Sequence, residues 1–339
     1  MDMTVEEFET VAAIPGLRVR RYAGPADMAT MVGITRAANL ADSFDYIPTV
    51  DQLANEINHP DGFDPERDIF IGELDGRPVA TGQVRYRDRD DEHTYELWGW
   101  VDPAARRRGI GRALLHLLEA RARDRAATEL STDRPIRLGT WGPDSAAGMA
   151  ALMDDEGYEA VRWFFEMIKA DLATPSRRPL PAGLEIRPTT MANLRQVFDA
   201  ENEAFRDHWG HHEFTDGEFV NLVEDPDLDL DLWRVAWDGD DVAGVVAVGI
   251  YADENEVLGV SRGWLDRISV RRRWRHRGVA TALILEACRA LQERGIGEGA
   301  LGVDADNPTG ALGLYENLGF VRMQRMTTWR KELEPTPDA

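Results

Sequence analysis

The sequence predicts an α/β fold that occurs twice in tandem, each copy a mixed, mostly antiparallel sheet flanked by helices. Three observations predict it: the length of 339 residues, an arginine-rich glycine turn that occurs twice, and a β-hairpin pattern present in each half. Since domains usually contain about 100–200 residues, this length favours two of them.

The two glycine turns are the clearest part of the repeat. They occupy residues 106–111 and 275–280 and read Arg-Arg-Arg-Gly-Ile-Gly and Arg-His-Arg-Gly-Val-Ala. Each follows a short apolar segment, at 97–101 and 265–270, in which we expect a strand. Each precedes a helix with one apolar face. The residues of these faces are Ile110, Leu114 and Leu118 in the first copy and Val279, Leu283, Ala287 and Leu291 in the second.

The repeat extends outward from the turns in both directions. Three pairs of segments correspond: the expected first strands at 17–20 and 184–187, the expected hairpins at 69–80 and 233–244, and the glycines before the last strands, Gly157 and Gly319. In the first hairpin, Asp75-Gly76 is a typical two-residue turn. Both halves are therefore predicted to have the same order of strands and helices.

The domain boundaries are expected where this pattern stops. Residues 1–170 form the first predicted domain and residues 184–339 the second. Between them, residues 171–183 contain three prolines and show no periodicity, which indicates a linker. The residues after Glu332 include two further prolines and are expected to be a loose tail.

Composition excludes several classes of protein. The net charge of −22 disfavours nucleic acid as a partner, and the acidic runs are interpreted as solvated loops. No apolar run approaches the ~20 residues that span a bilayer, and the acidic N-terminus does not resemble a signal peptide. A single cysteine, Cys288, fits a reducing compartment, and we interpret its side chain as packing. We therefore expect a cytoplasmic protein, either a monomer or a homodimer.

The chemistry of the glycine turns points to an anionic ligand. The N-terminus of a helix presents unpaired N–H groups and the positive end of the helix dipole. Gly278 and Ala280 would allow a pyrophosphate to approach the backbone closely, and Arg275 and Arg277 would add charge-assisted hydrogen bonds. A single turn of this kind is weak evidence, but two at matched positions after strands are stronger.

A second motif makes the pattern specific. It contains Asn307 and, further on, Leu314-Tyr315-Glu316-Asn317-Leu318-Gly319-Phe320. Together with the turn, it resembles the GNAT N-acetyltransferase superfamily, from about residue 17 to 169 and from 184 to 331. The tandem arrangement is similar to that of the mycothiol synthases.

The resemblance implies acetyl-CoA as co-substrate and a gap between two splayed strands that holds its pantetheine arm. The residues that it implies for cofactor binding are Ile268, Ser269, Val270, Arg275, His276, Arg277, Gly278, Val279, Ala280, Thr281 and Asn307 in the second copy, and Val101, Arg106, Arg108, Gly109, Ile110 and Gly111 in the first. Tyr315 would act as the general acid that protonates the departing thiolate. Asp266 is our first choice as general base and Glu203 is an alternative; either is equally a structural acid on sequence alone.

The first copy lacks the expected acid. When the glycines before the last strands are aligned, Tyr315 corresponds to Met153 and Asn307 to Ser145. A thioether cannot protonate a thiolate, so the first copy is expected to be degenerate. It either binds acetyl-CoA without turnover or serves as scaffold.

The histidine-rich segment 208–212 has no nearby ligand set for a metal, and we predict no metal site. A substrate-facing loop and an exposed polar loop both remain open. The predicted function is transfer of an acetyl group from acetyl-CoA to a primary amine, most simply that of a small molecule. The alternatives are acetylation of a cysteinyl-sugar amine, as in the mycothiol synthases, and a non-catalytic acyl-CoA-binding regulatory protein.

Overall fold

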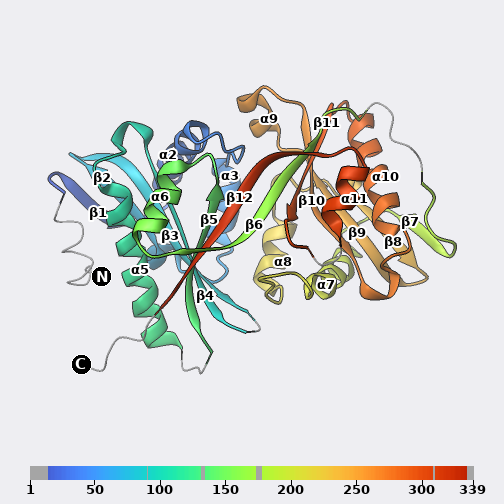
Figure 1. Cartoon of the computed structure of the whole chain (residues 1–339), viewed down its shortest axis with the longest axis horizontal. Coiled ribbons are helices and arrows are strands. Elements are labelled where there is room, and N and C mark those ends of the chain that lie inside the picture. Colours follow the sequence, from blue (N-terminus) through green and yellow to red (C-terminus); the bar gives the residue numbers. More distant parts are fainter. Residues whose placement is uncertain (1–13, 90, 131–133, 173–177, 308–309, 334–339) are drawn as a thin grey trace. The chain divides into compact units, whose positions relative to one another are not determined.

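The structure is a computed structural model that describes residues 14–89, 91–130, 134–172, 178–307 and 310–333. The segment 173–177 of the expected linker, the N-terminal residues 1–13 and the tail 334–339 lie outside these ranges. The chain divides into two compact units (Figure 1). Unit 1 contains Met1–Val161 and Thr327–Ala339, and unit 2 contains Arg162–Met326.

The sheet of unit 1 confirms the predicted mixed, mostly antiparallel topology. Its strands pair antiparallel from β1 to β4, whereas β4 and β5 are parallel. Asp75 and Gly76 form the predicted hairpin turn, with φ angles of 51° and 80°. The strands in spatial order are β1 (Leu17–Arg21), β2 (Ile69–Leu74), β3 (Arg77–Asp88), β4 (His93–Val101), β5 (Ile136–Pro143) and β12 (Val321–Glu332).

The sheet of unit 2 has the same topology. Its first four strands pair antiparallel, β10 and β11 are parallel, and β11 pairs antiparallel with β6. The strands in spatial order are β7 (Leu184–Arg187), β8 (Arg234–Asp238), β9 (Asp241–Gly249), β10 (Arg262–Val270), β11 (Glu298–Asp304) and β6 (Glu159–Lys169).

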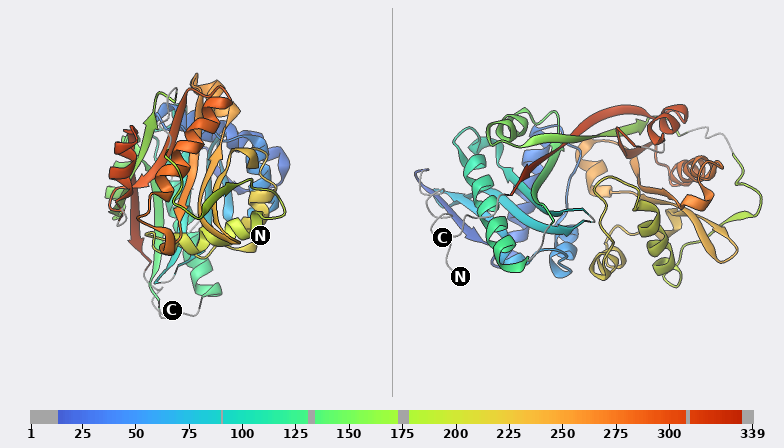
Figure 2. Two further views of the ribbon diagram at one scale, coloured as in Figure 1. Left: turned by 90° about the vertical axis from the view of Figure 1, so that its right-hand side faces the viewer. Right: turned by 60° about the horizontal axis from the view of Figure 1, so that its bottom comes forward.

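The last strands are exchanged between the two copies of the repeat. Strand β6 follows the first copy in sequence, yet most of it belongs to unit 2, where Phe164 pairs with Asp304. Strand β12 ends in unit 1 (Figures 1 and 2). There, Lys331 forms an ion pair with Glu119 at 3.0 Å. The units therefore differ from the expected ranges 1–170 and 184–339, because strand pairing at long range leaves no local pattern in the sequence.

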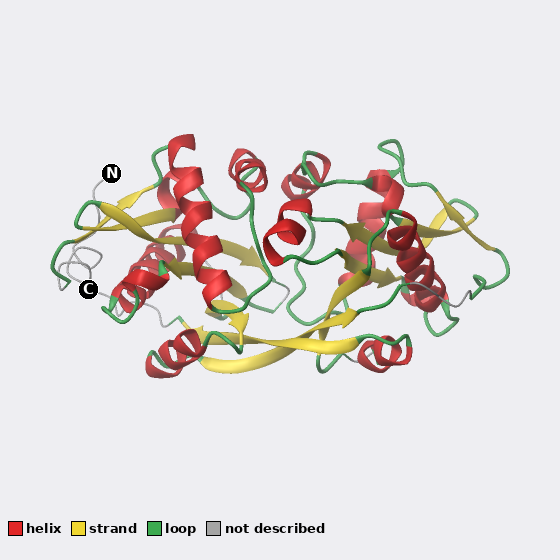
Figure 3. Ribbon diagram, turned by 90° about the horizontal axis from the view of Figure 1, so that it is seen from above, coloured by secondary structure: helices red, strands yellow, loops and turns green. Residues whose placement is uncertain are grey.

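Helices flank the sheets of both units (Figure 3). In unit 1 they are η1 (Pro25–Asp27), α2 (Met28–Ala41), α3 (Val50–Asn58), α4 (Pro65–Asp68), η2 (Pro103–Ala105), α5 (Ile110–Glu129) and α6 (Ala147–Asp155). In unit 2 they are α7 (Leu194–Phe205), α8 (Asp216–Val223), η3 (Leu230–Leu232), α9 (Ala252–Leu258), η4 (Arg272–Trp274), α10 (Val279–Glu293) and α11 (Ala311–Asn317). None of the helices in the described ranges is long and apolar enough to cross a membrane.

Each sheet has a hydrophobic core on both faces because successive strand residues point to opposite sides. In unit 1, Phe70 packs with the apolar residues of α5, whereas its neighbours Ile69 and Ile71 pack with those of α2. In unit 2, Ala236 packs with α10 and its neighbour Val235 packs with α7. The helix that follows each glycine turn is therefore fixed against its sheet.

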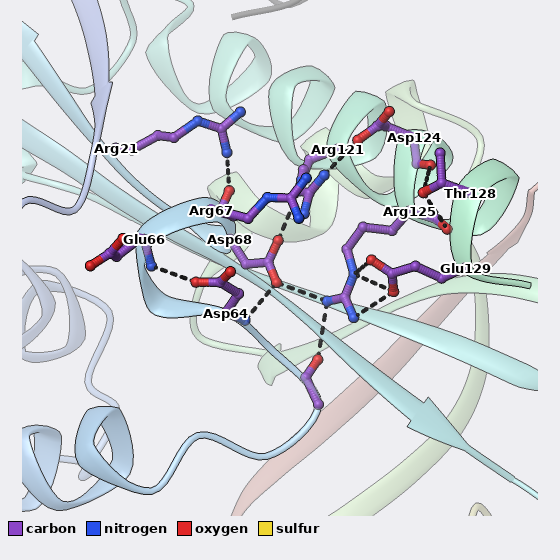
Figure 4. Close-up of polar contacts among 11 residues, drawn as sticks. Arg21, Asp64, Glu66, Arg67, Asp68, Arg121, Asp124, Arg125, Thr128 and Glu129 are labelled. Carbon is purple, nitrogen blue, oxygen red and sulfur yellow. Dashed lines mark hydrogen bonds and ion pairs between the residues drawn. The ribbon is translucent and has the colours of Figure 1, made fainter. Parts of the chain in front are cut away.

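A buried ionic cluster joins α4 to α5 in unit 1 (Figure 4). The Asp68 side chain is 1% exposed and accepts hydrogen bonds from Arg121 at 2.8 Å and Arg125 at 2.9 Å. Arg125 also lies over the ring of Tyr95, 5.5 Å from its centroid. Burial of a carboxylate is tolerated here because both guanidinium groups neutralise it.

Candidate functional site

The two glycine turns have the same backbone conformation. Gly109 and Gly278, which precede α5 and α10, have φ angles of 83° and 88°. Two residues earlier, Arg107 and His276 have φ angles of 63° and 59°. A left-handed conformation is rare for residues with a side chain, so its occurrence at both positions indicates a shared constraint.

The backbone N–H groups of these turns are available for a ligand. Within the described part of the chain, no acceptor is bound by the N–H groups of residues 107–112 or 276–281. Successive N–H groups in such a turn form a concave anion site, and the helix dipole adds to its positive potential. The exposed side chains of Arg108 and Arg277 likewise have no partner among the described residues. The turns therefore fit the pyrophosphate site predicted from the sequence.

Arg275 and Arg106 differ from the prediction, because their guanidinium groups bind the protein itself. Arg275 donates to the carbonyl oxygen of Val270 at 2.8 Å and forms an ion pair with Asp207 at 2.6 Å. Arg106 donates to the carbonyl oxygen of Val101 at 3.2 Å and pairs with Asp42 at 2.7 Å. These side chains hold the turn against the strand and helix beside it.

Three further predicted cofactor residues have buried side chains. Ile110 and Val279 belong to the hydrophobic cores, at 2% and 1% exposure, and Ser269 is also buried. Any contact that they make with a cofactor is limited to the backbone. His276, Ala280 and Thr281 lie in the second turn or the first turn of α10, as expected.

Each turn follows a strand that separates from its parallel neighbour. Strands β10 and β11 pair over only three positions, ending at Trp264 and Ala300, although β10 continues to Val270. Strands β4 and β5 pair over four positions, ending at Glu96 and Gly139. The splayed strands implied by the resemblance are therefore present in both units, with Ile268 and Val270 on the separated part of β10.

Unit 1 contains a cavity of about 520 Å³ at this position. Its walls are the separated parts of β4 and β5, the glycine turn and helix α6. Gly109, Gly111 and Val101 line it, as do Leu97 and Met153. The cavity has the place and chemistry expected for the arm of a cofactor bound at the first turn.

Tyr315 occupies a buried position on α11. Its ring is 6% exposed and contacts Phe320 edge-on, with 6.3 Å between the centroids. Burial raises the pKa of Tyr315, so the phenol keeps its proton at neutral pH. The N–H of Phe320 binds the carbonyl oxygen of Tyr315, as that of Tyr158 binds Met153 in unit 1. These equivalent hydrogen bonds confirm the alignment of Tyr315 with Met153.

Asp266 lies at a β-bulge of β10, between Leu265 and Arg267. Its side chain keeps exposed surface, yet the surrounding protein raises its pKa to about 7 by burial. Asp266 is therefore accessible at the surface, although its surroundings disfavour its charged form. The phenol of Tyr251 donates a hydrogen bond to it at 3.1 Å.

Glu203, the alternative base, has different properties. It forms an ion pair with Arg271 at 2.6 Å, and this partner lowers the pKa of Glu203. A carboxylate with a lowered pKa is a poor proton acceptor at neutral pH. The lowered pKa of Glu203 and the raised pKa of Asp266 therefore favour Asp266 as the candidate general base.

Arg178 is a residue near the second turn that the sequence analysis missed. Its guanidinium lies 3.5–3.7 Å from the position that a Cβ on Gly278 would take. The side chain is exposed, and it has no ion pair among the described residues. No local signal identifies it, because Arg178 is separated from Gly278 by most of unit 2.

The histidine-rich loop is held by contacts of its own. His212 pairs with Glu218 at 2.8 Å, and His208 packs against Phe205 with 4.6 Å between ring centroids. Arg162 of β6 lies over the ring of Trp209. The described residues contain no group of three or more side chains able to hold a metal ion.

Asn307 follows β11, and its N–H binds the carbonyl oxygen of Asp304.

Splayed strands that lead into a helix-capping anion turn define a protein that binds a phosphorylated cofactor through its backbone. The pattern of the acetyltransferase (GNAT) family matches residues 36–137 and 194–320. The chain belongs to this family and is an N-acetyltransferase with acetyl-CoA as its acetyl donor.

Proteins of similar sequence or structure match nearly the whole chain. The mycothiol acetyltransferase of Geodermatophilus obscurus is 28% identical over 334 residues, which are 95% of this chain and 99% of that protein. A GCN5-related N-acetyltransferase from Sphaerobacter thermophilus has a TM-score of 0.72 at 24% identity and covers 96% of this chain and 98% of its own. A tandem GNAT protein from the clavulanic acid biosynthesis pathway has a TM-score of 0.66 at 19% identity, with 94% and 99% covered.

Proposed function

We propose that unit 2 carries the catalytic site and that it acetylates the primary amine of a small molecule. The observation that carries this proposal is the exposed carboxyl group at the bulge of β10, where the surroundings raise the pKa of Asp266 to about 7 and Tyr251 donates a hydrogen bond to it. A general base is most effective when its pKa is close to the working pH. Tyr315, also in unit 2, supplies a protonated phenol for the opposite role.

The proposed reaction is a direct transfer. The carboxylate of Asp266 takes one proton from the ammonium group of the acceptor, and the free amine attacks the thioester carbonyl carbon. A C–N bond forms, the C–S bond breaks, and Tyr315 gives its proton to the departing thiolate. The second proton lost by the nitrogen restores the phenol through solvent. Backbone N–H groups on the separated part of β10 are suited to stabilise the oxyanion.

The cofactor is proposed to lie against the separated part of β10, with its pyrophosphate at residues 276–281. The unpaired N–H groups and the side chain of Arg277 support this placement. Asn307 is proposed to contact the pantetheine arm. Arg275 contributes by holding the turn in place.

For the acceptor, we favour an amine of a cysteinyl sugar. The similarity to mycothiol acetyltransferases extends along nearly the whole of both chains, and this supports the assignment. Other small primary amines serve as alternative acceptors in the panel of amines used to test this assignment. The match to these relatives includes unit 1 as well as unit 2. This adds support, since a single-domain acetyltransferase would match one unit only.

Unit 1 is proposed to bind acetyl-CoA without turning it over. Its cavity and its glycine turn support binding. At the position that matches Tyr315, however, unit 1 has Met153, which exchanges no proton. The register of β4 with β3 is continuous and has no bulged residue at the place of Asp266. This second candidate function is a cofactor-binding unit within the same enzyme.

Calorimetry with acetyl-CoA tests these proposals on the intact chain and on Gly109→Glu and Gly278→Glu. We expect two equivalents bound by the unaltered chain and one by each variant. Acetyl-CoA consumption over the amine panel should be lost only in Gly278→Glu. Absence of binding in the unaltered chain would contradict the assignment of both sites.

A further inference from the structure

Three residues meet at the bulge of β10, and they belong to the neighbouring strands β9 and β10 and to the segment that follows β9. Gly249 is the last residue of β9, Tyr251 follows it two positions later, and Asp266 is the bulged residue of β10. The phenol of Tyr251 donates to Oδ2 of Asp266 at 3.1 Å. The bulge matters because it leaves Asp266 without a partner position on β9, so the carboxyl group is free to turn toward the phenol.

Gly249 provides the space that the pair occupies. A Cβ at this position would lie 2.8 Å from Oδ2 of Asp266 and 2.9 Å from the phenol oxygen of Tyr251. Both distances are shorter than any normal carbon contact, so a side chain here would push the two groups apart. The φ angle of Gly249 does not lie in the left-handed region. The backbone conformation therefore does not require glycine at this position. The space taken by the hydrogen-bonded pair of Tyr251 and Asp266 does require it.

We propose that Tyr251 is a positioning residue for the proton transfer: its hydrogen bond orients the carboxylate of Asp266 and sets the pH range in which Asp266 accepts a proton. The proposal rests on the proposed role of Asp266 as general base. The role of Tyr251 itself is electrostatic and geometric, and it gains or loses no proton in the reaction.

The charges around Asp266 explain why this one hydrogen bond matters. Burial opposes ionisation of Asp266, as do the negative charges of Asp225, which follows α8, and Glu254 on α9. Arg267 favours ionisation, but it is also paired with buried Glu201 of α7 at 3.3 Å. The phenol of Tyr251 is the hydrogen-bond donor that favours the charged form. Without it, the balance moves toward the neutral acid.

The sign of the pH effect follows from this balance. Asp266 acts as a base only when ionised, so activity should fall as the pH drops below its pKa. Loss of the Tyr251 hydrogen bond raises that pKa further. The acidic limb of the kcat/KM profile should therefore move to higher pH, by about one pH unit for the loss of a hydrogen bond to a charged group.

The test combines NMR with kinetics on the full chain. Aspartate labelled with ¹³C at the carboxyl carbon reports the titration of Asp266, whose signal is assigned by its absence in Asp266→Asn. Tyr251→Phe should raise the titration midpoint of that signal and shift the pH profile equally, with little change in acetyl-CoA affinity. The matched control is Tyr158→Phe, which removes the phenol–carboxylate hydrogen bond to Glu119, 2.8 Å long, in unit 1. It should leave the Asp266 midpoint unchanged.

Gly249→Ala provides an independent variant that keeps both functional groups. It should also raise the midpoint, since the added methyl group separates the pair. An unchanged titration midpoint of Asp266 in both variants would overturn the role of Tyr251. If one variant does not fold, the other variant decides. If Asp266 is not the general base, the result is different: Asp266→Asn would keep full turnover with the unaltered pH profile.

Discussion

Arg275 forms an ion pair with Asp207 that links the second glycine turn to the end of helix α7. The two side chains approach to 2.6 Å, and Arg272 pairs with the same carboxylate. These partners lower the pKa of Asp207, so the carboxylate stays ionised at neutral pH. Unit 1 has the equivalent contact between Arg106 and Asp42. The contact therefore belongs to the architecture of the turn in both units.

Replacement of Asp207 by alanine should weaken acetyl-CoA binding to unit 2 by about tenfold, since a ligand must then order the turn itself. Calorimetry in the Gly109→Glu background measures this site alone. Asp229→Ala is the control, because it breaks the ion pair with Arg294 beyond the other end of α10. Equal affinity in Asp207→Ala and the control would show that the pair does not preorganise the turn.

Replacement of Tyr315 by phenylalanine should lower kcat by roughly a hundredfold, because a general acid contributes about 10²–10⁴-fold. Acetyl-CoA affinity should change little, since the ring and its contact with Phe320 remain. Steady-state kinetics with an acceptor from the panel and calorimetry measure the two quantities separately. Unchanged turnover would remove the assigned role of Tyr315.

Arg178→Ala should weaken binding of acetyl-CoA to unit 2 by about tenfold while leaving binding of S-acetylpantetheine unchanged. The guanidinium beside Gly278 adds positive charge where the N–H groups already attract an anion, and S-acetylpantetheine lacks the phosphates. Arg178→Lys should recover part of the loss. A comparable decrease with both ligands would indicate a general distortion instead of a phosphate contact.

Asp68→Asn should destabilise unit 1 strongly, since it leaves Arg121 and Arg125 buried around a neutral amide. Breaking a buried ionic cluster typically costs about 3–5 kcal/mol. Urea unfolding of the full chain should show an earlier transition than in the unaltered protein. Asp51→Asn, on the same unit at the exposed start of α3, is the comparison variant and should behave like the unaltered chain.

Cys288 should not react with a thiol reagent in the folded protein. It lies on the buried face of α10 with 1% exposure, and burial raises its pKa to about 11, so little thiolate forms. Addition of a chromogenic disulfide should give no signal until denaturant is added. Rapid modification of the native chain with loss of activity would contradict the packing role.

The local features of the fold were predictable because each leaves its own pattern. The Asp75-Gly76 hairpin turn, the helix after Gly109 and the helix after Gly278 follow from turn residues and apolar spacing within a few positions. The alignment of Met153 with Tyr315 was also predictable, because the repeat preserves the same helix-ending contact in both units. These features define the class of fold and the turns at which an anion is expected.

The sequence by itself determined the repeated α/β fold, the two glycine turns and the absence of a phenol at Met153, since these depend on neighbouring residues. Only the tertiary structure decided where distant segments meet. It turned Arg275 toward Asp207, brought Arg178 to Gly278, exchanged β6 and β12 between the sheets, and placed Tyr251 against Asp266. The physical reason is that a pairing partner, or the pKa of a carboxyl group, depends on everything within a few ångströms, and residues far apart in the chain supply most of those neighbours.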